Sequence, residues 1–184
     1  MVFFSGHGWN DSNNFYYFLP SNFDSNKVRS TGLRSSEIRD TVNTMAGKVI
    51  FFMDSCHSGN VLGTGKSKAA NDITAVVNEL SRAENGAVVF CASTGNQLSW
   101  EDPAWQNGAF TKAVIEGLQA KASPPQAEGD TLAILRAIQV SSKLTITMLD
   151  AYVSERVKQL TNGKQTPTGG RPTTIPDYAI NVRR

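Results

Sequence analysis

The chain has 184 residues, of which 40% are hydrophobic and 18% charged, and its formal net charge is +2. This length and composition are typical of one globular domain, residues 1–184, whose core needs no disulfide or metal. The longest apolar run falls far short of the ~18 residues of a membrane-spanning helix, and no basic run exceeds a pair, so neither a membrane nor a nucleic-acid partner is indicated. Two cysteines and no visible secretory signal favour a reducing, cytoplasmic location.

The first part of the chain predicts two strands, a helix and a third strand. Residues 2–5 form an apolar run that ends at Gly6-His7-Gly8, which predicts a buried strand closed by a sharp turn. The aromatic run 15–19, followed by proline, predicts a hairpin arm outside the main sheet. Helical spacing of apolar residues over 35–47 predicts a helix capped by one of two serines, and 48–54 is a continuous apolar strand.

The second part predicts helices that alternate with one further buried strand. Residues 60–71 are rich in Gly, Ser, Lys and Ala, which is typical of an exposed loop. Apolar periodicity and turn residues then predict a helix over 72–86, a strand over 87–93, a polar loop over 94–108, a helix over 110–118 and a long helix capped by Thr147 and ended by Asn162-Gly163. Strands without a polar face that alternate with helices predict an α/β fold with a mostly parallel sheet covered on both sides.

The residues best suited to catalysis or binding lie at three strand ends. These are Ser5-Gly6-His7-Gly8, Asp54-Ser55-Cys56-His57-Ser58-Gly59, and a loop with Ser99-Trp100-Glu101. Ligands and catalytic groups collect beyond the carboxyl ends of parallel strands. A Cys and a His on adjacent strands can lie close enough for the imidazole to activate the thiol. The pattern therefore predicts a cysteine nucleophile, although each residue alone also fits a buried thiol or a histidine in a turn.

The pair of motifs SGHG at 5–8 and DSCHSG at 54–59 resembles the catalytic strand ends of caspase-like cysteine peptidases, in the metacaspase and bacterial caspase-domain branch. The likeness continues to Thr174-Ile175-Pro176-Asp177-Tyr178 and covers nearly the whole chain, except for a poorly matching stretch at 122–144. It implies a caspase-like three-layer fold with a mostly parallel central sheet flanked by helices. Because a complete family domain begins with two further strands and a helix, it also implies a chain that lacks the first strands.

The resemblance assigns roles to individual residues. His7 would be the general base, Cys56 the nucleophile that forms a thioester acyl-enzyme, and the backbone N–H groups of Gly8 and Cys56 the oxyanion hole. Such a dyad needs no cofactor, because a thiol needs less activation than a hydroxyl. Many metacaspases bind calcium through an acidic cluster. Here the region after the histidine offers Asn22 and Asp24 but no clear acidic cluster, so no metal site is predicted and calcium activation is the less favoured alternative.

The expected specificity follows from charge. Where animal caspases have Ser-Trp-Arg in the loop that selects Asp, this chain has Ser99-Trp100-Glu101, and Ser5 and Asp54 match positions that line the basic-residue pocket of metacaspases. A carboxylate at the floor of the pocket favours Arg or Lys, so we expect protein or peptide substrates to be cleaved after these residues. Asp54 could instead cap local backbone amides, and Trp100 could wall a neighbouring substrate pocket or simply pack under its loop.

Several alternatives stay open. A caspase-like domain without activity would serve as a scaffold or binding module, and residues 63–67 partly resemble a nucleotide-binding P-loop whose first glycine is replaced by Asn60. The loop 60–71 is either a processing loop, cut after Lys66 or Lys68, or an uncut surface loop. The strand over 2–5 would have an exposed edge, which a dimer partner or a missing N-terminal segment supplied in trans would cover.

Overall fold

The computed structural model describes residues 1–11, 13, 15–57, 73–82, 87–94, 97, 99–119, 127–141 and 143–180, without the side chains of 56, 57 and 73–75. The expected loop 60–71, with its two lysines and its partial P-loop, lies outside the described residues. So does the start of the expected helix 72–86. Among the helices of the described part, none combines the length and the apolar character needed to cross a bilayer.

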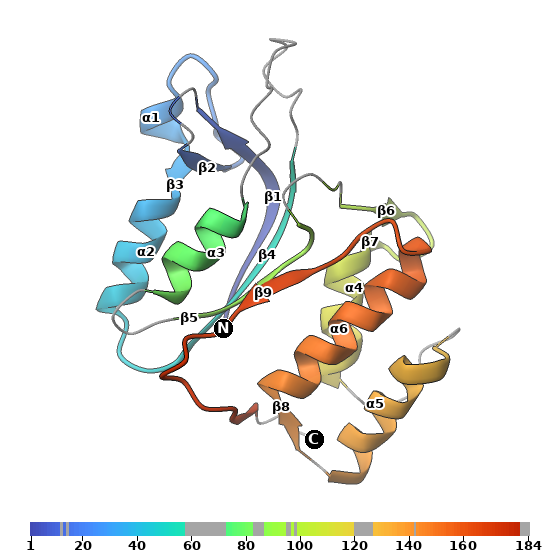
Figure 1. Cartoon of the computed structure of the whole chain (residues 1–184). Coiled ribbons are helices and arrows are strands. Elements are labelled where there is room, and N and C mark those ends of the chain that lie inside the picture. Colours follow the sequence, from blue (N-terminus) through green and yellow to red (C-terminus); the bar gives the residue numbers. More distant parts are fainter. Residues whose placement is uncertain are drawn as a thin grey trace.

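A six-stranded sheet forms the centre of the molecule (Figure 1). Its order is β3 (Leu33–Arg34), β2 (Tyr16–Leu19), β1 (Val2–Asn10), β4 (Val49–His57), β5 (Ala87–Cys91) and β9 (Thr168–Gly170). The three central strands β1, β4 and β5 are parallel, as their apolar runs predict. The remaining pairs are antiparallel, so the sheet as a whole is mixed.

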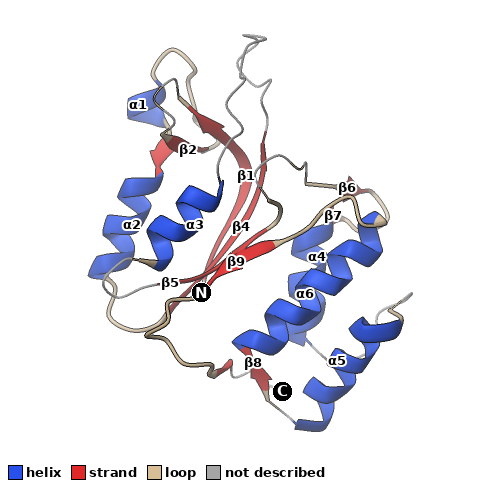
Figure 2. Cartoon of the chain, viewed as in Figure 1, coloured by secondary structure: helices blue, strands red, loops and turns tan. Residues whose placement is uncertain are grey.

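Helices cover both faces of this sheet and give a three-layer α/β fold (Figure 2). On one side lie α2 (Ser35–Thr44) and α3 (Ile73–Ser81), with the short α1 (Val28–Thr31) near the end of β2. On the other side lie α4 (Ala109–Gln119) and α6 (Ile146–Thr161), and α5 (Gly129–Ser141) packs on the outside of α6. Two small two-stranded sheets complete the fold: β6 (Glu101–Asp102) with β7 (Asn107–Gly108), and β8 (Leu144–Thr145) with β10 (Ala179–Ile180).

The core consists of two apolar clusters, one on each face of the sheet. Alternate residues of β4 enter different clusters, since Phe52 packs towards α4 and α6 while Phe51 packs towards α2 and α3. Both faces of β4 are buried, which explains why its sequence shows no alternation of polar residues. Cys91 belongs to the second cluster, and burial raises the pKa of its thiol to about 12, so it is a core residue as expected.

The first strand is longer than expected. The predicted turn at Gly6-His7-Gly8 is wrong, because these residues continue β1 and pair with both neighbouring strands. Two glycines allow the strand to continue here. Gly6 has a φ of 154°, which other residues rarely adopt, and a Cβ atom at Gly8 would lie 2.7 Å from the ring of Tyr16. The aromatic arm β2 is consequently part of the main sheet, not outside it, and its four residues are all buried.

Helix starts also differ from the expected ones by one or two residues. The first turn of α2 is closed by Arg34, whose backbone N–H donates to Glu37 Oε2 at 2.9 Å. The N-cap of α6 is Thr145, not Thr147, because Thr145 Oγ1 accepts the N–H of Met148 at 3.2 Å. The end of α6 is as predicted, with Asn162 in the left-handed conformation at a φ of 51°.

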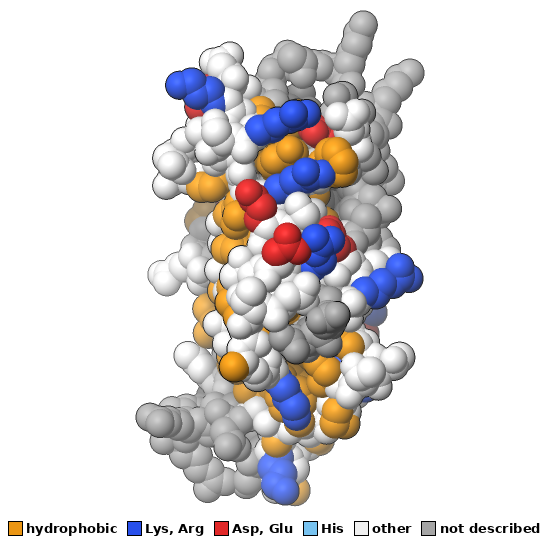
Figure 3. All heavy atoms as spheres, turned by 90° about the vertical axis from the view of Figure 1, so that its left-hand side faces the viewer, with side chains coloured by type: hydrophobic (Ala, Val, Ile, Leu, Met, Phe, Trp, Pro, Cys, Tyr) orange, Lys and Arg blue, Asp and Glu red, His pale blue; other side chains and the backbone are white. Residues whose placement is uncertain are grey.

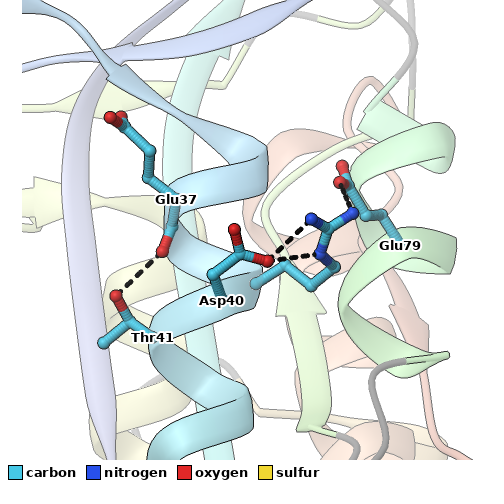
Figure 4. Close-up of polar contacts among 5 residues, drawn as sticks. Glu37, Asp40, Thr41 and Glu79 are labelled. Carbon is cyan, nitrogen blue, oxygen red and sulfur yellow. Dashed lines mark hydrogen bonds and ion pairs between the residues drawn. The ribbon is translucent and has the colours of Figure 1, made fainter.

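The helical face formed by α2 and α3 carries basic and acidic side chains beside one another (Figure 3). Arg39 on α2 binds Glu79 on α3 at 3.0 Å and its neighbour Asp40 at 2.6 Å. Figure 4 shows these contacts as dashed lines, with the carboxylates of Asp40 on α2 and Glu79 on α3 on opposite sides of the guanidinium group. The ion pairs lie at the surface, so apolar packing carries most of the contact between the two helices.

Candidate active site

The parallel pairing of β1 and β4 determines how the two candidate catalytic positions lie. His7 is the Cα partner of Cys56, and Gly8 is the partner of His57. Neighbouring strands are about 4.8 Å apart, so the backbone brings positions 7 and 56 side by side at the carboxyl ends of two central strands. The His7 side chain is exposed, and that of Cys56 lies outside the described atoms.

A buried hydrogen bond lies next to these two positions. Tyr16 Oη and Ser55 Oγ are 2.8 Å apart, which links β2 to the residue before Cys56. The same phenol lies against Gly8, the residue after His7. Sequence analysis did not find Tyr16, because its proximity depends on the register of the β1–β2 hairpin.

A cavity of about 620 Å³ opens beside the strand ends. It brings together three of the expected substrate-binding residues, Ser5, Asp54 and Glu101. Ser5 and Asp54 are direct partners across β1 and β4, and Glu101 comes from the hairpin β6–β7. The described lining also contains Asp102 from the same hairpin, an acid that sequence analysis missed.

Asp54 is the buried acid of this cavity, with an exposed fraction of 7%. Burial raises the pKa of its carboxyl group, hydrogen bonds from the Thr111 side chain and backbone lower it, and the nearby charge of Glu101 raises it, with a net upward shift. Asp54 Oδ2 thus accepts a hydrogen bond from Thr111 Oγ1 in the first turn of α4. The acid accepts a backbone hydrogen bond at the start of a helix and also lines the cavity.

The loop before the hairpin carries the remaining candidates. Ser99 and Trp100 are not among the described residues that line the cavity. The Trp100 indole is 40% exposed and lies 4.5 Å from Lys164 Nζ, a cation–π contact. Its backbone contributes more directly, because the carbonyl of Trp100 accepts the N–H of Ala109 at 2.8 Å, next to Gly108 in the cavity wall.

The part of the chain that the structure describes contains no group of three His, Cys, Asp or Glu side chains arranged to bind a metal ion. Of the two residues considered for calcium, Asn22 is exposed. Asp24 Oδ1 accepts the backbone N–H of Asn26 at 2.9 Å within a turn.

The three-layer α/β fold, with a histidine and a cysteine paired across its central parallel strands, defines a caspase-like domain. The chain matches the family model of the caspase domain, peptidase family C14, over residues 1–174, and it belongs to this family of cysteine peptidases. A comparison with curated proteins gives no significant match.

Proposed function

We propose that the chain is a cysteine endopeptidase that uses Cys56 and His7 as a catalytic dyad. The observation that carries the proposal is the register of β1 and β4, which pairs these two positions in a domain of this family. His7 accepts the thiol proton as Cys56 Sγ bonds to the scissile carbonyl carbon, and returns it to the leaving amine when the C–N bond breaks. Water then hydrolyses the thioester and regenerates the thiol.

The backbone N–H groups of Gly8 and Cys56 stabilise the oxyanion of the tetrahedral intermediate in this proposal. Removing one such donor typically lowers kcat by about 10²–10³-fold. A glycine is needed at position 8 for packing, since the Tyr16 phenol fills the space that a side chain would take. The chemistry as proposed requires no cofactor, so we expect the rate to be unchanged by a chelator of divalent cations.

We further propose that the enzyme cleaves after Arg or Lys. The cavity beside the dyad is lined by the carboxyl groups of Asp54, Glu101 and Asp102, and a cationic side chain would neutralise this charge. The guanidinium group of an arginine can donate two parallel hydrogen bonds to the two oxygens of one carboxylate, which favours arginine over neutral side chains. Ser5, which also lines the cavity, adds a hydroxyl that can bind the same group.

Hydrolysis of fluorogenic peptides that end in Arg, Lys or Asp tests both parts of this proposal. We expect cleavage of the Arg and Lys peptides only, and a loss of kcat of about 10³-fold or more in Cys56→Ala and His7→Ala. Cys91→Ala is the matched control, because the second cysteine is buried in the core and should be dispensable for activity. Equal background rates in the wild type and both dyad variants would contradict catalysis and favour a binding module. A preference for Asp would contradict only the specificity.

A further inference from the structure

Gln165 is a buried polar residue that the proposed chemistry does not use. It follows α6, and none of its surface is exposed. Its Nε2 donates to the carbonyl of Ala92, just beyond β5, at 2.7 Å, and its Oε1 accepts the N–H of Trp100 at 2.8 Å. One side-chain amide therefore links the end of a central strand to the loop that precedes the acidic hairpin.

The neighbouring residue strengthens this link. The backbone N–H of Thr166 donates to Gln97 Oε1 at 2.7 Å, and its carbonyl accepts the N–H of Thr94 at 3.1 Å. Residues 165 and 166 thus hold the described part of the segment 94–100 at three points. The Gln165 amide itself is buried, and a buried polar group is costly to leave unsatisfied, so its bonds favour this position of the segment.

Hydrogen bonds and strand pairing connect Trp100 to the cavity. The Trp100 carbonyl accepts the N–H of Ala109, and Glu101, the next residue, pairs with Gly108 across the hairpin. A Cβ atom at Gly108 would lie 3.0 Å from Asp54 Oδ2, so the hairpin and the buried acid are in close contact. Moving Trp100 would therefore move the acids of the hairpin relative to Asp54.

We propose that Gln165 is a positioning residue of the substrate cavity, which sets selectivity for a cationic side chain without touching the substrate. The inference rests on the proposed function, since it assigns a role in the cavity where Arg or Lys would bind. Gln165 acts through Trp100: with the amide in place, Glu101 and Asp102 face the cavity together with Asp54.

The variant Gln165→Met tests this role, since methionine has a similar length and shape but cannot replace either hydrogen bond. We expect KM for the Arg peptide to rise about tenfold, with kcat changed much less, and the preference for Arg over an uncharged residue to fall in proportion. Gln165→Glu keeps an acceptor for the Trp100 N–H but sets a carboxylate oxygen against the Ala92 carbonyl, so it should also raise KM. Gln97→Met, which removes a bond nearer the surface, should give a smaller change in the same direction.

Gln159→Met is the matched control. Gln159 is on α6 and its Nε2 also donates to a backbone carbonyl, that of Glu128 at 2.8 Å, but its side chain makes no hydrogen bond to the described residues of the segment 94–100. This variant should leave KM and selectivity at wild-type values. A KM increase in Gln159→Met as large as that in Gln165→Met would show a general effect of stability and overturn the proposal.

Amide hydrogen exchange gives a readout that is independent of activity. We expect the Trp100 amide to exchange at least tenfold faster in Gln165→Met, and faster by a smaller factor in Gln97→Met, than in the wild type and Gln159→Met. Unchanged exchange at Trp100 together with unchanged KM overturns the positioning role. If the wild type hydrolyses no peptide, the proposed function fails, and exchange at Trp100 still decides whether Gln165 holds the loop.

Discussion

At the scale of single residues, Asp54 combines a place in the proposed substrate cavity with an environment that disfavours its charge. Its carboxyl group is buried, with the charge of Glu101 nearby, and its pKa is raised above the ordinary value. Between the unfolded pKa of about 3.9 and the raised folded pKa, the folded state binds more protons than the unfolded state. Stability is therefore lost as pH rises through this interval, and the penalty is complete once the pH exceeds both pKa values.

The substitution Asp54→Asn is expected to stabilise the protein at pH 7 and to remove the preference for Arg and Lys. Asparagine keeps an acceptor for Thr111 Oγ1 but is never charged, so the penalty of a buried carboxylate disappears. Urea denaturation measures the first effect, and the ratio of kcat/KM for Arg and uncharged peptides measures the second. Asp40→Asn, at an exposed position on α2, is the control. An undiminished Arg preference in Asp54→Asn would contradict the role of this acid.

Gly8→Ala is expected to lower kcat/KM at least tenfold. The added methyl group would overlap the ring of Tyr16, at 2.7 Å, so the backbone beside His7 must shift, at a cost of about 1–3 kcal/mol in stability. Gly129→Ala is the control, since a Cβ atom there meets nothing within 4 Å but its φ of 53° still disfavours alanine. Steady-state kinetics and thermal unfolding of both variants separate the effects. Equal activity of the two at equal stability would contradict a special requirement at Gly8.

At the scale of elements, α4 and α6 are held together by a buried ion pair. Arg156 on α6 is 1% exposed and binds Glu116 on α4 at 2.8 Å. Lys112 binds the same carboxylate at 3.0 Å, and the Tyr152 hydroxyl donates to it at 3.2 Å. Burial alone would raise the pKa of Glu116, but the hydrogen bonds and charges of Arg156 and Lys112 outweigh it and lower this pKa.

Glu116→Ala is expected to destabilise the protein by about 3 kcal/mol, because it removes the carboxylate opposite a buried guanidinium. Since the folded pKa of Glu116 is lowered, its contribution is present above the unfolded value of about 4.3 and is lost as pH falls through the folded value. Chemical denaturation at pH 7 and pH 3 measures both effects. Glu79→Ala, which breaks the surface pair with Arg39, should change stability little. Similar losses in both variants would contradict the difference between buried and exposed pairs.

Elements buried on both faces could be predicted from the sequence, and elements at the edges could not. The strands over 48–54 and 87–93 are continuous apolar runs because both of their faces enter the core. Strand β9 has no such apolar run, because its glycines allow the neighbouring strand β5 to come close. A Cβ atom at Gly169 would lie 2.9 Å from the Val89 carbonyl oxygen. Helix α5 was missed because apolar residues also occupy its outer face, where Val140 is 86% exposed.

For the molecule as a whole, the candidate site is assembled from distant segments, and this decides which of its parts could be predicted. The motifs placed Ser5 and Asp54 at strand ends, and the cavity contains both. Thr111, Asp102 and Gln165 carry no local signal. Their positions depend on how α4, the acidic hairpin and the end of α6 meet above the sheet. Sequence motifs can predict which residues lie at the ends of adjacent strands. They do not predict which residues from other elements tertiary packing brings to the same cavity.

The central claim, a Cys56–His7 dyad beside an acidic cavity, is tested most directly by covalent labelling with a peptide chloromethyl ketone that ends in Arg. The thiolate displaces chloride, which forms a stable carbon–sulfur bond at the nucleophile. We expect one adduct per chain by intact mass, mapped to the peptide with Cys56, formed at least about tenfold faster than with an Asp ketone and strongly slowed in His7→Ala. Labelling of Cys91, equal rates with the two ketones, or a rate unaffected by His7→Ala would contradict the account.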